Sequence, residues 1–473
     1  MANATHVKLL KTLDAAEERE PILKDIAALT ADLLHNTGRG LQLADANLAN
    51  LDLADADLTG AVLNRATLHS TSLRGALLDR VTMICPGMER TDLTDASMRD
   101  AYVHALAAQT SIFDNADLSN LRDATGSLFH GCSMRGTAMP SGQLAGTTFY
   151  QCDLEGADLK AANLQGTTIN ESVLRGTDFD NAVADQLTVT KSDMAGTRLC
   201  GMTGIGVVVQ RATNCDGLDL SGARLPRLRL DGLRGHSVVA RDLHAPDADI
   251  GHCCLPGVDL SAAALPGLRL YDSDLAGAKL SSASLVAASV HRTCLTEADL
   301  VNVQAENLHV VEAQFRRTRM RGFTGRSAVF RDVDMRGADL SQSNLYRAMI
   351  TGDPPRGMCL AEASLAGAIL VQAYIAADLS NADLREVNAA YSRFSQSDLT
   401  GADLTGAALF QSTWVKVTCR GAKLAGIKPP FFADRCIGLK EALNEADTPD
   451  AVALSSYLTA FEDVLRGEQH GST

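Results

Sequence analysis

The sequence predicts a repeat fold made of stacked coils, and three observations within residues 41–63 support this prediction. First, leucine returns at every fifth position, as Leu43, Leu48, Leu53, Leu58 and Leu63. Second, a small residue lies two places before most of these leucines, and Asp or Asn often lies one place before them. Third, a period of five differs from the 3.6 residues of an α-helix and from the 2 of a β-strand. A short period sustained along a chain indicates a repeat architecture.

The pattern, written A(D/N)LXX, resembles the pentapeptide-repeat family. The resemblance implies an all-β fold, a right-handed quadrilateral β-solenoid with one pentapeptide on each side and about twenty residues in each coil. The leucine, which we call the centre of each pentapeptide, and the small residue two places before it would point inward. The other three positions would point outward and accept polar residues. We expect residues 39–427 to form about 19 such coils.

The five-residue register shifts by one residue at three places, near residues 129–133, 215–219 and 376–378. In this scheme Leu128 is the last centre before the first shift, and Asn214 is the last before the second. Each shift predicts a bulge or a short loop, because the ladder of paired strands cannot hold an extra residue. Residues 351–357 (TGDPPRG) would put Pro355 at a centre, which predicts a protruding turn.

Both ends of the chain break the period of five. Residues 1–38 have apolar residues at helical spacing, which predicts a helical cap over the exposed backbone edge of the first coil. Residues 428–473 predict a C-terminal helical segment with an apolar stripe that includes Leu458, Phe461 and Leu465. In some pentapeptide-repeat proteins such helices form dimers. We therefore expect this segment to cap the solenoid and to make a homodimer contact, whereas docking of a partner is an alternative role for the N-terminal helices.

The composition indicates a protein without a membrane span. The chain has 473 residues, a net charge of −14 and no apolar run long enough to cross a bilayer. Its N-terminus lacks the basic start and apolar block of a secretory signal. The eleven cysteines form no CxxC pair. We therefore expect free thiols in a reducing cytoplasm.

No motif predicts catalysis, a cofactor or a metal site. The sequence has no GxSxG, P-loop or HExxH motif. A regular solenoid also offers convex faces rather than the cleft that an active site prefers. Residues 244–254 gather His, Asp and Cys, which are zinc-binding residue types. The register puts them on different sides of a coil, so we expect no metal there.

Two surface patterns are candidates for binding a partner, and the first consists of arginines. Five of them each lie one place after a centre, at Arg316, Arg321, Arg326, Arg331 and Arg336. Because four consecutive pentapeptides make four sides, these residues would form a belt around one coil. An arginine belt suits an acidic protein surface. It does not suit nucleic acid, because no aromatic residues interleave for base stacking. The alternative is a solvated surface, partly neutralised by Asp332 and Asp334.

The second pattern consists of aspartates twenty residues apart, which would stack on the same face. Asp378 precedes Asp398 by twenty residues, and Asp383 precedes Asp403 in the same way. Some pentapeptide-repeat proteins mimic B-form DNA through acidic stripes and bind type II topoisomerases, which gives quinolone resistance. The resemblance allows this function here. The diluted net charge and the arginine belt count against it.

The sequence as a whole therefore predicts a cytoplasmic, non-enzymatic scaffold that binds another protein, with no cofactor and no direct contact to nucleic acid. The first alternative is a DNA-mimic inhibitor of a type II topoisomerase. The second alternative is a secreted effector or a secretion-system accessory protein, by analogy with bacterial pentapeptide modules.

The inward direction of the centres can be tested at two neighbouring residues. We expect Leu159→Asp to collapse the central coils, because it places an unpaired charge in a tube without room for water. Asp158→Ser is the matched control and should leave folding intact, because residue 158 points outward. Thermal melting of both variants checks this prediction, and an unchanged melting temperature for Leu159→Asp would contradict it.

Overall fold

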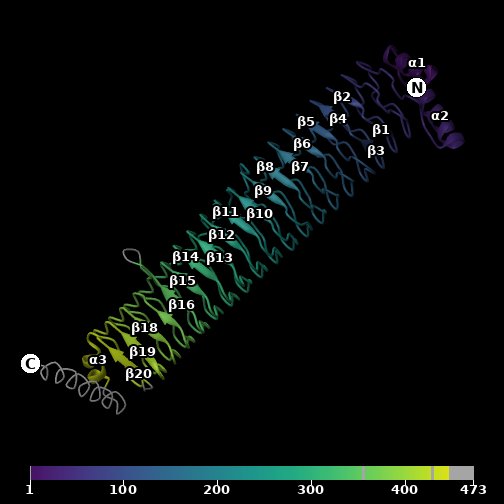
Figure 1. Ribbon diagram of the computed structural model, residues 1–473. Coiled ribbons are helices and arrows are strands. Elements are labelled where there is room, and N and C mark those ends of the chain that lie inside the picture. The colour runs from purple at the N-terminus through teal and green to yellow at the C-terminus, as the bar shows by residue number, and fades with distance from the viewer. Residues whose placement is uncertain (1, 354–356, 428–430, 447–473) are drawn as a thin grey trace, which may run out of the picture. The chain divides into compact units, whose positions relative to one another are not determined.

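The computed structural model describes residues 2–353, 357–427 and 431–446. The chain is divided into two compact units, Met1–His244 and Ala245–Thr473. Each unit is a parallel β-solenoid, with helices at the N-terminal end of the first and the C-terminal end of the second (Figure 1). The predicted all-β solenoid with helical ends is therefore confirmed.

Short strands and helices make up both units. In the first unit they are α1 (Ala4–Asp14), α2 (Glu20–Thr37), β1 (Thr82–Ile84), β2 (Gly87–Glu89), β3 (Tyr102–His104), β4 (Ala107–Gln109), β5 (Leu128–His130), β6 (Thr148–Tyr150), β7 (Thr168–Asn170), β8 (Thr188–Thr190), β9 (Val208–Gln210) and β10 (Arg229–Asp231). In the second unit they are β11 (Asp249–Gly251), β12 (Arg269–Tyr271), β13 (Ser289–His291), β14 (His309–Val311), β15 (Val329–Arg331), β16 (Met349–Thr351), β17 (Tyr374–Ile375), β18 (Arg393–Ser395), β19 (Ser412–Val415), β20 (Phe431–Asp434) and α3 (Leu439–Glu445).

Each coil has four sides because it makes four separate backbone pairings with the next coil. The first coil pairs through the bridges Gln42↔Val62, Asn47↔Thr67, Asp52↔Ser72 and Asp57↔Leu77. All four are parallel and join residues twenty apart. The residue one place before each centre therefore forms the ladder between coils. The remaining outward positions form the corners, which add a further bond, as from the N–H of Asp45 to the Asn64 carbonyl at 2.8 Å.

A tight turn at each corner explains why Asp and Asn are frequent before the centre. In the turn after Leu53, the N–H of Ala56 donates to the Leu53 carbonyl at 3.2 Å, and Asp55 has a positive φ of 62°. This hydrogen bond and this φ are features of a type II turn. The N–H of Ala54 points into the corner and donates to Oδ1 of Asp52 at 3.1 Å. An aspartate at this position therefore satisfies a turn amide as well as carrying charge.

The centres fill the inside of each coil. Leu159 is only 1% exposed, so its predicted inward direction is confirmed. Buried threonines at the small-residue position donate their hydroxyls to carbonyls of the preceding coil, as Thr71 does to Leu48 at 2.8 Å. Phenylalanines enlarge the core in both units, whereas a Leu- and Val-rich stretch between Ile250 and Phe315 leaves an apolar cavity of about 20 Å³.

The two single-residue insertions lie earlier than predicted. Ser97 pairs with Asp117 at the usual spacing of twenty, whereas Tyr102 pairs with Asp123, one position further on, so the extra residue enters between 117 and 123. Leu128, predicted as a centre, is therefore 43% exposed, and the fully buried Phe129 takes the inward site. The error arose because Leu128 and Phe129 are both apolar, so the period alone could not choose between them.

The same correction applies to the second insertion. Val208 follows its partner Thr188 by the usual twenty residues, whereas Arg229 follows its partner Val208 by one residue more. The buried centre of this pentapeptide is therefore Cys215 rather than the predicted Asn214.

The third irregularity concerns the number of residues between paired positions of successive coils, which we call the coil step. A long coil step is followed here by a short one. The step from Met349 to Tyr374 exceeds the usual spacing by five positions, and the extra positions enter between Thr351 and Cys359. The next step, from Tyr374 to Arg393, is one position shorter than usual. Pro355, predicted in a protruding turn, lies outside the described residues.

The second solenoid continues beyond its predicted end at residue 427. β20 pairs in parallel with β19, and Ile437 bridges to Thr418. Phe431 is buried, with its ring centroid 5.2 Å from that of Trp414. The prediction that residues 428–434 leave the solenoid was therefore wrong for the strand β20. This strand lacks the usual pattern, because Ala433 lies at the centre position opposite Trp414 and Phe431 lies at the small-residue position opposite Ser412. Helix α3 follows directly and buries Leu439, Ala442 and Leu443.

The N-terminal helices cover the open edge of the first coil, which has no preceding coil to pair with. The N–H of Asn3 donates to the Gln42 carbonyl at 2.8 Å, and the N–H of Gln42 donates to Nδ1 of His6 at 3.0 Å. Burial lowers the pKa of His6, which favours the neutral ring that this hydrogen bond requires.

The last residue of α1 and helix α2 cover two further positions of this edge. Oδ1 of Asp14 accepts the N–H of Asp52 at 2.7 Å, and the Thr30 hydroxyl donates to the Asp57 carbonyl at 2.9 Å. Gln42, Asp52 and Asp57 are the residues that a preceding coil would bind. The N-terminal segment therefore supplies hydrogen bonds to three of the four paired positions of the first coil, in place of a preceding coil.

Replacing Thr30 by Val should loosen this cap. The change keeps the side-chain volume but leaves the Asp57 carbonyl without its hydroxyl donor, at a cost of about 1 kcal/mol. Hydrogen exchange at the amides of α2 should then be about fivefold faster. Thr12→Val is the control, because the exposed Thr12 hydroxyl binds only Lys8 of its own helix. Equal exchange in both variants would show that the cap does not depend on this bond.

Candidate functional site

The predicted arginine belt lies at the corners of the second unit. Each of its five members follows a buried centre, namely Phe315, Met320, Gly325, Phe330 and Met335 in chain order. All five arginines are exposed: Arg316, Arg321, Arg326, Arg331 and Arg336. The repeat therefore places one arginine at each corner of a coil, with Arg336 one coil beyond Arg316.

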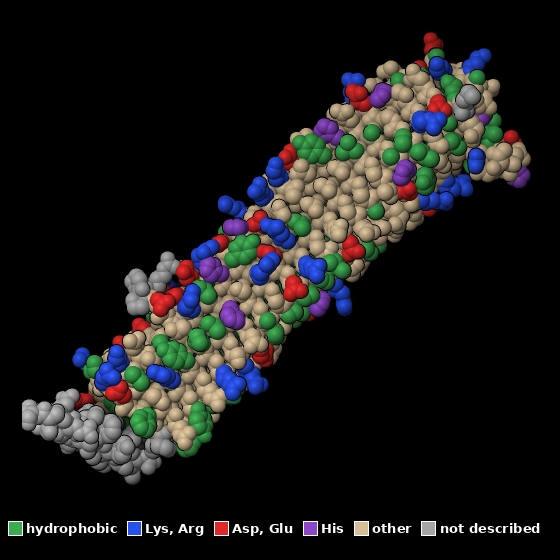
Figure 2. Space-filling view, viewed as in Figure 1, with side chains coloured by type: hydrophobic (Ala, Val, Ile, Leu, Met, Phe, Trp, Pro, Cys, Tyr) green, Lys and Arg blue, Asp and Glu red, His purple; other side chains and the backbone are tan. Residues whose placement is uncertain are grey.

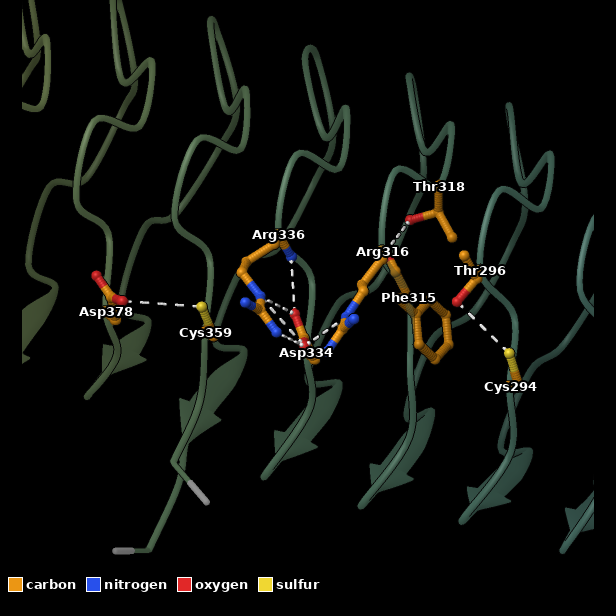
Figure 3. A network of polar contacts seen from close by, with 9 residues as sticks. All are labelled: Cys294, Thr296, Phe315, Arg316, Thr318, Asp334, Arg336, Cys359 and Asp378. Carbon is orange, nitrogen blue, oxygen red and sulfur yellow. Dashed lines mark hydrogen bonds and ion pairs between the residues drawn. The ribbon is translucent and has the colours of Figure 1, made fainter. Parts of the chain in front are cut away.

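One carboxylate joins two members of the belt (Figure 3). Nε of Arg316 lies 2.7 Å from Oδ2 of Asp334, and Nη2 of Arg336 lies 2.6 Å from the same oxygen. Burial of Asp334 acts to raise its pKa, but the hydrogen bonds from Arg336 and Arg316 outweigh burial and lower the pKa to about 2. The two arginines thus share a single negative charge, and this part of the belt keeps excess positive charge.

The other three arginines have weaker carboxylate contacts. Nε of Arg331 lies 3.8 Å from Asp332. Arg326 lies over the ring of Tyr346, 5.6 Å from its centroid. For Arg321, no ion pair is found within the described part of the chain. These guanidinium groups remain available to solvent or to a partner.

The predicted stacks of aspartates form, but their carboxylates already have local partners. The bridges Asp378↔Asp398 and Asp383↔Asp403 place each pair on one face. All four side chains accept a turn N–H from the residue two places on: Ser380 to Asp378, Arg385 to Asp383, Thr400 to Asp398 and Thr405 to Asp403.

Two of these four aspartates also form ion pairs. Nη2 of Arg385 lies 2.7 Å from Asp383, and Nζ of Lys423 lies 3.5 Å from Asp403. On the face shown in Figure 2, acidic and basic side chains are likewise interspersed rather than gathered in separate stripes. The stacks therefore present less unpaired negative charge than their sequence indicates.

The remaining sequence candidates do not converge into a site. Asp249 is paired with Arg269, and Cys253 is buried. Among residues 2–353, 357–427 and 431–446, no group of three or more His, Cys, Asp or Glu residues is arranged to hold a metal ion. In the same ranges no helix has the length and apolar character that a bilayer crossing requires. Leu458, Phe461 and Leu465 lie outside the described residues.

The structure adds one surface that the sequence reading missed. It lies at the corner whose successive turns contain Arg326, Tyr346 and Arg347, Gln372, Tyr391, and Phe410. We call these six residues the aromatic corner. Nε of Arg347 and the hydroxyl of Tyr346 both bind Oε1 of Gln372, at 2.7 and 3.0 Å. The rings of Tyr391 and Phe410 meet edge to face at 5.5 Å and are 51% and 42% exposed.

Acid should weaken the contact between Arg316, Asp334 and Arg336. Because the pKa of Asp334 is about 2 in the folded chain and 3.8 in the reference state, its stabilisation is complete above pH 4 and disappears as the pH falls through 2. Asp334→Asn keeps the turn acceptor and should cost up to about 1 kcal/mol at pH 6. The difference in melting temperature from the unmodified protein should vanish near pH 2.

Asp339→Asn is the control for this experiment. Asp339 accepts the N–H of Ser341 in the same kind of turn, and no ion pair involves it within the described part of the chain. Its variant should show no such pH dependence. A difference for Asp334→Asn that is as large at pH 2 as at pH 6 would contradict the assignment.

The comparisons with known proteins agree with this geometry. The family model for pentapeptide repeats, described as eight copies, matches residues 42–80, 143–176, 157–196, 267–302, 311–347 and 377–413. Among curated proteins, no sequence match was found.

Several solved structures are similar to the chain. QnrB1, a plasmid-mediated fluoroquinolone resistance protein, is 15% identical, and the match covers 44% of this chain and 83% of that chain with a TM-score of 0.25. HetL, a pentapeptide repeat protein involved in heterocyst differentiation regulation from the cyanobacterium Nostoc sp. strain PCC 7120, is 21% identical, with 65% and 90% covered and a TM-score of 0.14. The PL6 family alginate lyase AlyGC is 7% identical, with 83% and 98% covered and a TM-score of 0.19.

All three TM-scores lie below 0.5, and we draw nothing about function from them. The repeat matches, together with the observed four-sided coils of twenty residues, identify the chain as a member of the pentapeptide-repeat family.

Proposed function

We propose that the protein is a non-enzymatic scaffold that binds an acidic protein through the arginine belt. The observation that carries this proposal is a local reversal of charge. Residues 311–347 contain eight arginines and four carboxylates, whereas the whole chain has a net charge of −14. Positive charge concentrated on one part of an acidic protein attracts acidic surfaces and repels other basic ones.

The side-chain contacts support a binding surface rather than an active site. The polar groups of the belt are held by ion pairs and ring contacts at convex corners. The small cavity in the second unit is lined by apolar side chains such as Leu270, Val290 and Leu300. Such a lining offers no group that could act as a nucleophile, an acid or a base.

The DNA-mimic hypothesis receives less support from the structure. Each of the stacked aspartates 378, 383, 398 and 403 accepts a turn amide, and two are paired with basic side chains. A supercoiling assay with gyrase in the presence of this protein tests the hypothesis directly. The cytoplasmic location and the dimer through terminal helices also stay predictions.

The belt can be tested with a double variant of the full chain, Arg321→Gln with Arg326→Gln. These changes remove two charges from exposed side chains without breaking a described carboxylate pair. Proteins captured by the immobilised chain from a cell extract should include an acidic protein whose retention falls at least tenfold in the variant. Retention by the unmodified chain should also fall as salt is raised, because exposed charges are screened.

Arg224→Gln with Arg227→Gln is the matched control. Both of these arginines are exposed corner or face residues of the first unit, outside the belt. The control should capture the same acidic protein as the unmodified chain. Equal retention by all three proteins would refute binding through the belt.

A further inference from the structure

The aromatic corner lies at the middle of a surface sector without carboxylates. The corner turns of five successive coils contain Arg326–Ser327, Tyr346–Arg347, Val371–Gln372, Ala390–Tyr391 and Phe410–Gln411. Backbone hydrogen bonds join them in this order, for example from the N–H of Ser327 to the Tyr346 carbonyl at 2.8 Å, and from Tyr391 to Phe410 at 2.8 Å. The sector therefore follows one corner of the second unit along the direction in which the coils stack.

The two neighbouring faces extend this sector. On one side lie the bridge residues Thr324, Asn344, Ile369, Asn388 and Ala408. On the other side lie Val329, Met349, Tyr374, Arg393 and Thr413 of strands β15 to β19. None of these twenty outward positions is acidic and three are arginine, although the chain as a whole has 57 acidic and 43 basic residues.

The sector is also unusually apolar for an outer surface. Ile369 is 39% exposed and Met349 is 46% exposed, in addition to Tyr391 and Phe410. Four large hydrophobic side chains on this corner and its two neighbouring faces form a surface that water solvates poorly. Charge and hydrophobicity together fit an occupant with an apolar stripe and several carboxylates.

The chain itself contains a segment with these properties. Residues 447–473 contain five carboxylates and one arginine. Leu454, Leu458, Phe461 and Leu465 lie at spacings of four, three and four residues, which predicts one apolar stripe on a helix. The segment follows Ala446, just after α3 at the C-terminal end of the second unit.

The dimensions of the stripe and the sector agree. Leu454 and Leu465 are eleven residues apart, so a helix would separate them by about 16 Å. Tyr346 and Phe410 are three coil steps apart, which is about 14 Å at the usual strand spacing. One helix of this length would therefore cover the corner from Phe410 to Tyr346.

The direction of the chain agrees as well. A segment that starts at the C-terminal end of the solenoid reaches Phe410 and Tyr391 first, with its apolar residues Leu454 and Leu458. Glu462, which borders the stripe, then arrives at Arg347 and Arg326, the two arginines that lie over the ring of Tyr346. We propose that residues 447–466 dock as a helix along the aromatic corner of the same chain, with Leu454 near Phe410 and Glu462 near Arg347.

This docking would affect the arginine belt. Arg326 belongs to the arginine belt, so a docked tail would compete with an acidic partner for that part of the belt. The docking itself does not rest on the proposed function. Its test uses the protein without any partner, so its failure is distinguishable from failure of the belt.

Hydrogen exchange of the full-length protein, measured by mass spectrometry, tests the docking. The amides of residues 450–466 should be protected in the unmodified chain, and Tyr391→Ala with Phe410→Ala should speed their exchange at least tenfold. Leu128→Ala is the control, because Leu128 is 43% exposed but lies in the first unit. Unprotected amides in the unmodified chain, or unchanged protection in the double variant, would overturn the proposal.

A charge exchange tests the direction of docking without changing the aromatic side chains. Arg326→Glu with Arg347→Glu should also speed exchange of the tail, and adding Glu462→Arg should restore part of the protection. A triple variant that stays as unprotected as the double variant would refute this orientation. Protection that rises with protein concentration, together with a dimeric mass, would assign the occupant to a second copy and overturn docking within one chain.

Discussion

The hydrogen bonds between coils are the constraint on which the rest of the structure depends. In each pentapeptide the residue before the centre pairs with the equivalent residue of the next coil, as Asp158 pairs with Asp178. Because this pairing is made again on every side of each coil, an inserted residue does not disrupt the pairing of the following coils. The two single-residue insertions are taken up within the ladder. At the first of them, the N–H of Arg122 donates to the Ala101 carbonyl, and the Asp123 carbonyl accepts the N–H of Val103. The long step at Met349–Tyr374 is followed by a short one at Tyr374–Arg393, after which the spacing returns to twenty.

The sequence was sufficient to predict the coil, the inward centres and the N-terminal helices, because each of these follows from a period of hydrophobic residues. It failed where two adjacent residues are equally apolar, as at Leu128 and Phe129, and in β20, where Ala433 lies at the centre position and Phe431 at the small-residue position. The aromatic corner was missed for a related reason. The spacing from Tyr391 to Phe410 is shorter than twenty, and that from Tyr346 to Gln372 is longer, so a search at a fixed spacing of twenty does not find them.

Charge in the sequence was a weaker guide than hydrophobicity. The aspartates before the centres looked like a free acidic surface, but their oxygens accept turn amides and several are paired with arginine or lysine. The arginine belt differs from them, because Arg316 and Arg336 share one carboxylate and Arg326 rests on an aromatic ring. The structural role of an aspartate is thus visible only when the turn that contains it is known.

The cap formed by α1 and α2 has a consequence for how the chain is made. These helices leave the ribosome before any coil does, and domains begin to fold while synthesis continues. The first coil therefore emerges beside a surface that already offers His6, Asp14 and Thr30 as hydrogen-bond partners. Growth of the first solenoid can then proceed from one end only, with a single open edge at any moment. A nascent chain with one such edge has half as many places at which a neighbouring chain could pair and aggregate.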